Sequence, residues 1–228
     1  MDNLNQTNGF SVQNISGLWI IGLSILLLAG AISILPEEVV RELISENGPV
    51  ETISALLYLV AAGVLLKMWS TTRRGAILSS SCVSLLLGLR ELDFHSRFTT
   101  MGIFKTKFYV SSTVPIMEKM IVTAIVLTLL YCLIRYLANN RTIFFAHLKQ
   151  RKTWALAVAA AIFCIITSKV LDGNSEPFQH LLFWHQAPEL FIWTLEEVME
   201  MAIPAFILVA AFSYRNEFCN KKAMDLIS

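Results

Sequence analysis

The sequence predicts an all-α, polytopic membrane protein, built as a bundle of about six transmembrane helices with short interfacial helices on the outer side. The first observation behind this prediction is composition: 55% of the 228 residues are hydrophobic, only 15% are charged, and the mean hydropathy is +0.61. Such a chain would expose too much apolar surface in water. The second observation is that apolar runs and short connections use up almost all of residues 1–228, so we expect a single integral membrane domain.

Six apolar runs have the roughly 17 to 25 residues that a helix needs to cross a bilayer. The first run resembles a signal peptide, because Ala29-Gly30-Ala31 has the small-x-small form of a cleavage site. No Lys or Arg precedes it, however, and it continues to Leu35, so we expect a mature helix. The predicted spans are approximately 17–35, 50–69, 76–92, 113–137, 153–171 and 190–213.

The distribution of charge predicts the orientation. Eleven of the 18 Lys and Arg residues follow the second, fourth and sixth spans, whereas 14 of the 17 acidic residues belong to the opposite side. Since basic residues are retained in the cytoplasm, we expect both termini to be cytoplasmic and the acidic side to face outward. In a bacterium this would be an inner-membrane protein with a periplasmic acidic site.

Two outer segments are predicted to lie at the membrane interface. Pro36 and the acidic pair Glu37-Glu38 are typical of a helix start, and the apolar residues of 39–44 share one face. We expect a short surface helix there, more an anchor than a chemical participant. The approach to the last span is aromatic and apolar, which is typical of an interfacial belt and also compatible with a lipid-entry rim. Its residues are Phe178, Leu181, Leu182, Phe183, Trp184, Phe191 and Trp193.

The second and third spans bring polar groups to the outer end of the bundle. Glu51 occupies the first turn of its span, where helix capping alone would also account for it. If the third helix continues through its polar end, Ser84, Gly88, Glu91 and His95 share a face. Gly88 is then better explained by close helix packing than by room for a ligand. Glu91 and His95 are spaced either to bind one ion or to form an intrahelical hydrogen bond.

The later spans add further charges at the same end. Glu118 lies about one turn into the fourth span beside Lys119, and Lys169 precedes Asp172 by three residues at the end of the fifth, where an interfacial ion pair is the simplest interpretation. In the last span, Glu196 and Glu200 stack on one helical face with Glu197 to the side. If these like charges are sequestered from water, they need a cation, a basic partner from another span or shared protons. If they are hydrated, their place at the start of the helix is enough to stabilise them.

These residues define a carboxylate-rich site with three predicted roles. A divalent metal, of unknown identity, would be held by Glu91, His95, Glu118 and Glu200. Glu51 or Glu196 would serve as the catalytic base, and the substrate would be bound by Arg90, Lys119, Lys169 and Asp172. The main alternative is an internal network of Glu, Lys and Arg side chains without a metal.

Two short segments, Glu51-Thr52-Ile53-Ser54 and Phe94-His95, resemble early motifs of alkaline-ceramidase-like membrane hydrolases. That resemblance implies a zinc site built from an acid, a serine, an aspartate and three histidines. The last span departs from the pattern, because Glu196, Glu197 and Glu200 stand where that family has paired histidines. The zinc ligands of the family therefore do not transfer to this chain residue by residue.

Two classes of function follow from this site. The first is a metal-dependent hydrolase or transferase that acts on a lipid or lipid-linked substrate, since the site lies at interfacial depth and among aromatic residues. The second is a proton or divalent-cation transporter or sensor, or an accessory subunit that binds a partner through its acidic face. Few polar residues continue toward the cytoplasm, which disfavours transport. Membrane lipids are the expected partners, and nothing in the sequence indicates nucleic-acid binding.

Overall fold

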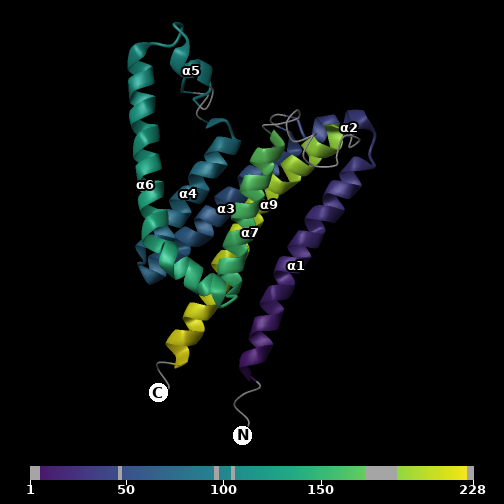
Figure 1. Cartoon of the computed structure of the whole chain (residues 1–228), viewed down its shortest axis with the longest axis vertical. Helices are drawn as coiled ribbons and strands as arrows, with labels where there is room; N and C mark the ends of the chain where they lie inside the picture. The colour runs from purple at the N-terminus through teal and green to yellow at the C-terminus, as the bar shows by residue number, and fades with distance from the viewer. Residues whose placement is uncertain (1–5, 46–47, 95–97, 104–105, 173–188, 225–228) are drawn as a thin grey trace.

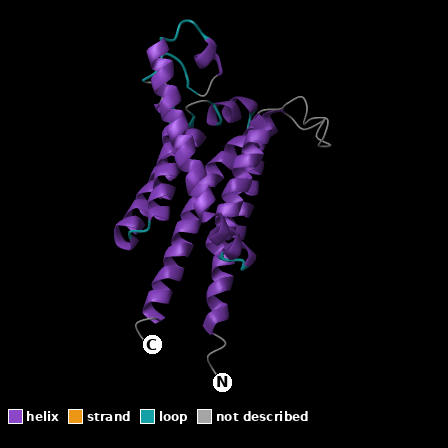
Figure 2. Cartoon of the chain, turned by 60° about the vertical axis from the view of Figure 1, so that its left-hand side comes forward, coloured by secondary structure: helices purple, strands orange, loops and turns teal. Residues whose placement is uncertain are grey.

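The structure is a computed structural model that describes residues 6–45, 48–94, 98–103, 106–172 and 189–224. Within these residues every regular element is a helix (Figures 1 and 2). The helices are α1 (Gln6–Ser33), α2 (Glu37–Leu43), α3 (Pro49–Thr72), α4 (Gly75–Glu91), α5 (Thr106–Val110), α6 (Ile116–Lys149), α7 (Thr153–Asp172) and α9 (Glu189–Met224).

Each predicted span coincides with a helix, and three helices are long and apolar enough to cross a membrane: α3, α6 and residues 153–171 of α7. In α1 the apolar stretch is shorter, from Leu18 to Ile32. The described part of the chain is therefore all-helical with three candidate membrane spans, and it does not confirm six.

Two helices continue beyond their predicted spans. We expected the basic segment after residue 137 to be a loop, but α6 continues through it to Lys149. Neither Gly nor Pro occurs between Ile116 and Lys149, so nothing in the sequence interrupts the helix where it stops being apolar. In the same way, α9 extends past residue 213 to Met224.

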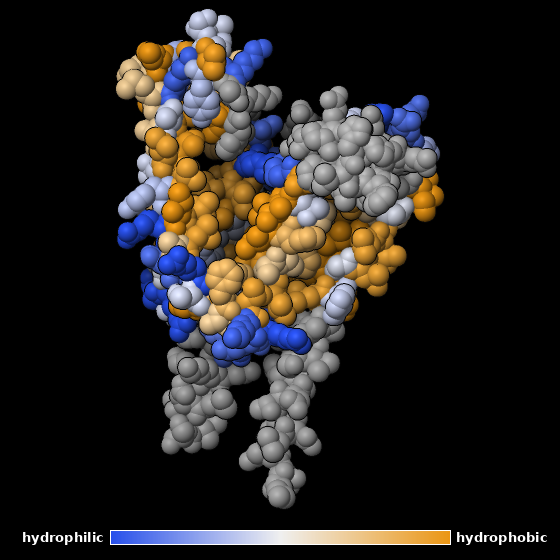
Figure 3. All heavy atoms as spheres, viewed as in Figure 1, coloured by the Kyte–Doolittle hydropathy of each residue, from blue (hydrophilic) through white to orange (hydrophobic). Residues whose placement is uncertain are grey.

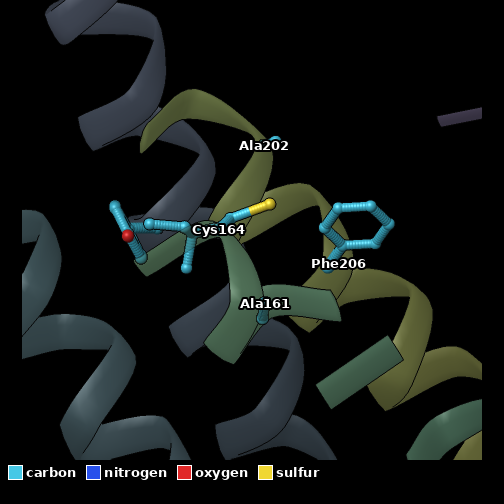
Figure 4. Packing of buried hydrophobic residues seen from close by; sticks show 6 residues of the cluster. Ala161, Cys164, Ala202 and Phe206 are labelled. Atoms are coloured by element: carbon cyan, nitrogen blue, oxygen red, sulfur yellow. The ribbon is translucent and has the colours of Figure 1, made fainter. Parts of the chain in front are cut away.

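Helix α9 is the centre of the bundle, with α7, α3 and α1 packed against it and α4 packed against α3 (Figure 1). The largest core cluster lies where α3, α7 and α9 meet. Figure 4 shows Ala161 and Cys164 of α7 beside Ala202 and Phe206 of α9. Small side chains let helix backbones approach closely, which is how membrane helices commonly associate.

Helices α3 and α4 are joined by both steric fit and hydrogen bonds. A Cβ atom on Gly88 would lie 2.9 Å from the Cβ atom of Tyr58, so only glycine fits at this crossing. The hydroxyl of Ser81 donates to the carbonyl oxygen of Ala62 at 2.8 Å, and that of Ser84 donates to the carbonyl oxygen of Tyr58 at 3.1 Å. Gly88 therefore has the close-packing role that the sequence favoured.

Helix α6 is only loosely attached to the rest of the bundle. Only 6% of its most apolar stretch is buried inside the protein. It contacts α7 beside the turn that joins them and contacts α4 through a 2.7 Å hydrogen bond between the hydroxyls of Tyr136 and Ser80. Figure 3 shows a hollow between α6 and the rest of the bundle, with apolar walls and a hydrophilic upper end. We call this space the α6 hollow.

The start of α1 and the end of α9 lie at the same end of the bundle (Figures 1 and 2). The basic turns between α3 and α4 and between α6 and α7 lie at this end too. Contacts tie these turns to α9: the Arg74 guanidinium donates to the Tyr214 hydroxyl at 2.6 Å, and the Lys152 ammonium lies 2.8 Å from the Glu217 carboxylate. Helix α2, helix α5 and the end of α4 lie at the opposite end.

Candidate functional site

A layer of polar side chains lies directly on the apolar core, toward the α2 end of the bundle. The apolar layer contains Tyr58, Cys164 and Ile203, and Gly88 abuts Tyr58. Positions three or four apart share one face of a helix. One helical turn from this apolar layer toward α2, each of the helices α3, α4, α7 and α9 carries a polar residue on the same face. We call this set the polar layer, and its residues are Ser54 of α3, Arg90 and Glu91 of α4, Ser168 and Lys169 of α7, and Glu200 of α9.

Glu200 is the centre of an ion-pair network in the polar layer. Its Oε1 atom lies 3.1 Å from Lys169 Nζ and 3.9 Å from Arg90 Nη2. Arg90 Nη1 also lies 3.7 Å from Glu91 Oε1. Only the Lys169 contact is short enough for a hydrogen bond, whereas the two Arg90 contacts are longer charge pairs. A basic partner from another helix thus compensates Glu200, as one of our three alternatives for this glutamate predicted.

The members of this network differ in exposure. The side chains of Glu91 and Glu200 are 7% and 13% exposed, whereas those of Arg90 and Lys169 are 39% and 44% exposed. Buried carboxylates need compensating charge, and long basic side chains supply it while their charged ends stay near a polar phase. The two basic groups are therefore the accessible part of the polar layer.

Three further glutamates lie beside the network. The charge of Glu51 acts on Glu91, and Glu197 experiences the charges of Glu196, Glu200 and Glu51. These carboxyl groups come from α3, α4 and α9, so the three helices bring together acids that are far apart in the sequence. Of the two residues predicted as the catalytic base, Glu51 borders the polar layer through its effect on Glu91, and Glu196 borders it one helical turn before Glu200.

The metal site that we predicted is not assembled among the described residues. No group of three or more His, Cys, Asp and Glu side chains there is arranged to hold a metal ion. Helix α4 ends at Glu91, and Asp93 has a left-handed backbone with φ of 45°, so the helical spacing expected between Glu91 and His95 does not apply. His95 itself lies outside the described residues. The described residues therefore provide no donor set for a metal, and we derive no chemical step through one.

Glu118 and Lys119 stabilise the loop before α6 instead of joining the polar layer. The Glu118 carboxylate accepts hydrogen bonds from the backbone N–H and the hydroxyl of Thr100, both at 2.7 Å. The Lys119 ammonium donates to the carbonyl oxygen of Ser111 at 2.7 Å. Asp172 is the last residue of α7, and its side chain lies outside the described part of the structure. Among the predicted substrate-binding residues whose side chains are described, Arg90 and Lys169 are the two that the structure brings together at Glu200.

The predicted interfacial helix is present as α2, and it is attached to α9. Val40 is fully buried, whereas Val39 is exposed, so the apolar residues of 39–44 do not all face the protein. The Arg41 guanidinium lies 5.6 Å from the ring centroid of Trp193 and pairs with Glu37 at 2.7 Å. Sequence reasoning assigned no contact to Arg41, although its place inside one predicted interfacial segment and the aromatic residues of the other were a usable signal. Of the predicted aromatic approach, only Phe191 and Trp193 are among the described residues.

Sequence reasoning also missed the exceptional status of Ser54. Ser54 is 1% exposed, and its hydroxyl is the one buried side-chain polar atom in the described structure without a hydrogen-bond partner. By contrast, the equally buried Ser84 and Ser168 donate to backbone carbonyl oxygens. A hydroxyl's partner depends on the neighbouring helix, so no sequence pattern indicates this difference.

Comparisons with protein-family models, curated proteins and solved structures give no match to this chain. The resemblance to alkaline-ceramidase-like hydrolases therefore has no support from a family model.

Proposed function

We propose that this chain is a membrane-embedded enzyme, a hydrolase or transferase, that binds a lipid or lipid-linked substrate at the polar layer. The observation that carries the proposal is the convergence of Arg90 and Lys169 on Glu200, with both basic groups accessible and both carboxylates buried. Arg90 lies in the last turn of α4, at the same end of the bundle as the hydrophilic end of the α6 hollow (Figure 3). A lipid would place its headgroup there.

The α6 hollow supports entry from the membrane. Its walls are apolar, and α6 buries little of its apolar surface against the protein. Exposed apolar residues are abundant on both helices beside it, including Ile121, Ile125 and Leu129 of α6 and Ile162, Phe163 and Ile166 of α7. Acyl chains would occupy this space while the headgroup meets Arg90 and Lys169, which suit phosphate oxygens because their hydrogen bonds are charge-assisted.

The proposed chemistry uses carboxylates as bases. Glu51 or Glu196 would accept a proton from water in a hydrolase, or from an acceptor hydroxyl in a transferase, as the oxygen attacks a carbonyl or phosphoryl group. The bond from that group to the lipid's ester oxygen would then break, and the same carboxyl would return the proton to the departing alcohol. Arg90 and Lys169 would stabilise the negative charge that develops in the transition state. A divalent metal could perform that stabilisation, but this version of the proposal lacks a donor set among the described residues.

The transport alternative is less well supported. Tyr58, Cys164, Ile203 and Phe206 form an apolar layer immediately beneath the polar one. A cation that crossed the bundle would have to pass through this layer, where an ion is costly without partners. A sensor or an accessory subunit needs no such path, and both stay predictions.

The membrane arrangement is also part of the proposal. We propose six spans, with α1, α4 and α9 crossing beside the three apolar helices, both termini in the cytoplasm and the polar layer facing outward. In a bacterium the polar layer would face the periplasm from the inner membrane. The shared location of the basic turns at one end of the bundle supports this orientation.

The test of lipid binding is native mass spectrometry of the full chain purified in mild detergent. Arg90→Met and Lys169→Met should each lose co-purified or added phospholipid. Lys149→Met, at the end of α6 that lies away from the polar layer, should retain it. Lipid retention that is equal in all three variants would contradict the proposal.

The enzyme proposal needs a second test, which is product formation from a panel of membrane lipids. Glu51→Gln and Glu196→Gln should lower turnover without loss of bound lipid, because a glutamine cannot act as a base. Glu217→Gln, near the far end of α9, is the matched control and should keep full turnover. If wild-type protein binds lipid but converts none of the panel, the binding proposal stands and the enzyme proposal fails.

A further inference from the structure

Ser54 indicates that the polar layer has a ligand-binding position which the residues named above do not fill. Ser54 is 1% exposed, and its hydroxyl has no hydrogen-bond partner in the described structure. A buried hydroxyl without a partner is unfavourable, and such groups in native proteins commonly mark the place of a ligand or a bound water. A partner for Ser54 therefore needs to be identified from its surroundings.

The surroundings of Ser54 follow from the packing of α3 against α9. Ser54, Tyr58 and Leu65 lie on one face of α3, and Tyr58 and Leu65 pack in clusters with α9 residues. The two helices run in the same direction (Figure 1), and Tyr58 shares its cluster with Ile203. Ser54 precedes Tyr58 by one helical turn, and Glu200 precedes Ile203 by one helical turn, so Ser54 and Glu200 lie at the same height along the bundle. Ser54 thus lies on the face of α3 that packs against α9, at the level of Glu200.

Carboxylates outnumber basic groups around this position. The polar layer holds Glu91 and Glu200 against Arg90 and Lys169, and Glu51 and Glu196 border it. This excess of carboxylates favours an added cation over an added anion. The Glu200 carboxylate already pairs with an ammonium group, because Lys169 Nζ lies 3.1 Å from Glu200 Oε1. The Lys169 side chain is flexible and 44% exposed. A ligand ammonium could take that place.

We propose that the polar layer binds the primary ammonium of a zwitterionic aminophospholipid, with Glu200 and the Ser54 hydroxyl as its hydrogen-bond acceptors. Arg90 and the displaced Lys169 then face the phosphate of the same headgroup. This inference rests on the proposed function, in that it assumes a lipid at this site, and it adds the class of headgroup. A primary ammonium has three N–H donors, whereas a trimethylammonium has none and cannot satisfy Ser54.

The experiment is a titration of the full chain with phosphatidylethanolamine, phosphatidylcholine and phosphatidylglycerol of identical acyl chains, followed by native mass spectrometry. Phosphatidylethanolamine should bind most tightly, and Ser54→Ala should weaken its binding by about threefold to tenfold, the effect of one hydrogen bond. The preference for phosphatidylethanolamine should fall with Glu200→Gln as well. Equal binding of all three lipids, or tighter binding of phosphatidylglycerol, would overturn the inference.

Ser84→Ala is the matched control, because Ser84 is equally buried but already donates to the carbonyl oxygen of Tyr58. Ser84→Ala should lower the Tm and leave the lipid preference intact. Ser54→Ala should leave the lipid-free Tm unchanged or raise it, since it removes a hydroxyl without a partner. If Ser54→Ala lowers the Tm as Ser84→Ala does, or keeps wild-type affinity, the inference is wrong. If no lipid binds at all, the proposed function fails with it, whereas binding without amine preference overturns this inference alone.

Discussion

Unequal burial of the two partners sets the energetics of the Lys169 and Glu200 ion pair. Glu200 is 13% exposed and has Arg90, at 3.9 Å, as a more distant charge partner, while Lys169 is 44% exposed. Without Lys169, a largely buried carboxylate loses its closest counter-charge. Without Glu200, the lysine can extend its flexible side chain toward a polar phase. The glutamate therefore depends on the pair more than the lysine does.

We expect Lys169→Met to destabilise the protein more than Glu200→Gln does. The double variant should be less destabilised than the sum of the two, with a coupling free energy of roughly 0.5 to 3 kcal/mol. Denaturant-induced unfolding in detergent would measure the cycle. The Lys152 and Glu217 pair is the control, since its members are both 40% exposed at 2.8 Å and should couple by less than about 1 kcal/mol. Equal coupling in the two cycles would show that burial does not matter here.

For single residues, the sequence predicted which charged side chains need an ion-pair partner, but it did not predict which residue is that partner. Two glutamates one turn apart required compensation, and a basic residue from another span was one of the expected solutions. Lys169 was expected to pair with Asp172, its neighbour on the same helix. Its ammonium lies 3.1 Å from Glu200 on α9, a contact that depends on the tertiary packing of α7 against α9 and that local spacing does not encode. The expected pairing with Asp172 stays a prediction, because that side chain lies outside the described structure.

At the scale of elements, the crossing of α3 and α4 depends on one missing side chain. A Cβ atom at Gly88 would meet the Cβ atom of Tyr58 at 2.9 Å and the carbonyl oxygen of Ala55 at 3.4 Å. The first contact is at a Cβ atom, which cannot move without its backbone. The helices would have to separate, which would also disturb the hydrogen bond from Ser84 to the Tyr58 carbonyl.

Gly88→Ala should therefore lower the free energy of unfolding by roughly 1 to 3 kcal/mol, the usual cost of overpacking. Gly63→Ala, on the exposed side of α3, has no atom within 4 Å of the added Cβ and should be neutral or stabilising by up to about 1 kcal/mol. Thermal unfolding in one detergent would compare them. Similar effects for both variants would mean that helix propensity, and not the crossing, determines the outcome at Gly88.

Helix positions were predictable from the apolar runs, whereas helix ends and helix contacts were not. The run at 76–92 matches α4 closely, but we allowed the helix to continue to His95, and Asp93 instead adopts a left-handed backbone after Glu91. A run of favourable residues does not reveal such a stop when no Gly or Pro marks it. The loose attachment of α6 was equally invisible, because lipid-facing and protein-facing residues are both apolar.

At the scale of the whole molecule, the number of helices that cross the bilayer depends on the length and position of α4. Helix α4 has 17 residues and so extends about 26 Å, slightly less than the roughly 30 Å of a typical hydrocarbon core. Its two ends nevertheless lie at opposite ends of the bundle, with the basic turn of Arg73 and Arg74 at one and the polar layer at the other. Local thinning or polar side chains at the ends would accommodate that difference in length.

Crossing by α4 can be tested with single cysteines in a full-length chain whose natural cysteines are replaced. Thr100→Cys follows α4, while Arg74→Cys precedes it, so six spans require the two positions to lie on opposite sides. Because basic residues are retained in the cytoplasm, a membrane-impermeant maleimide should label Thr100→Cys in intact bacterial spheroplasts and label Arg74→Cys only after lysis. Lys149→Cys, between α6 and α7, should behave like Arg74→Cys. Labelling of Thr100→Cys and Arg74→Cys from the same side would show that α4 does not cross, and the polar layer would then have to be reached from within the bilayer by another route.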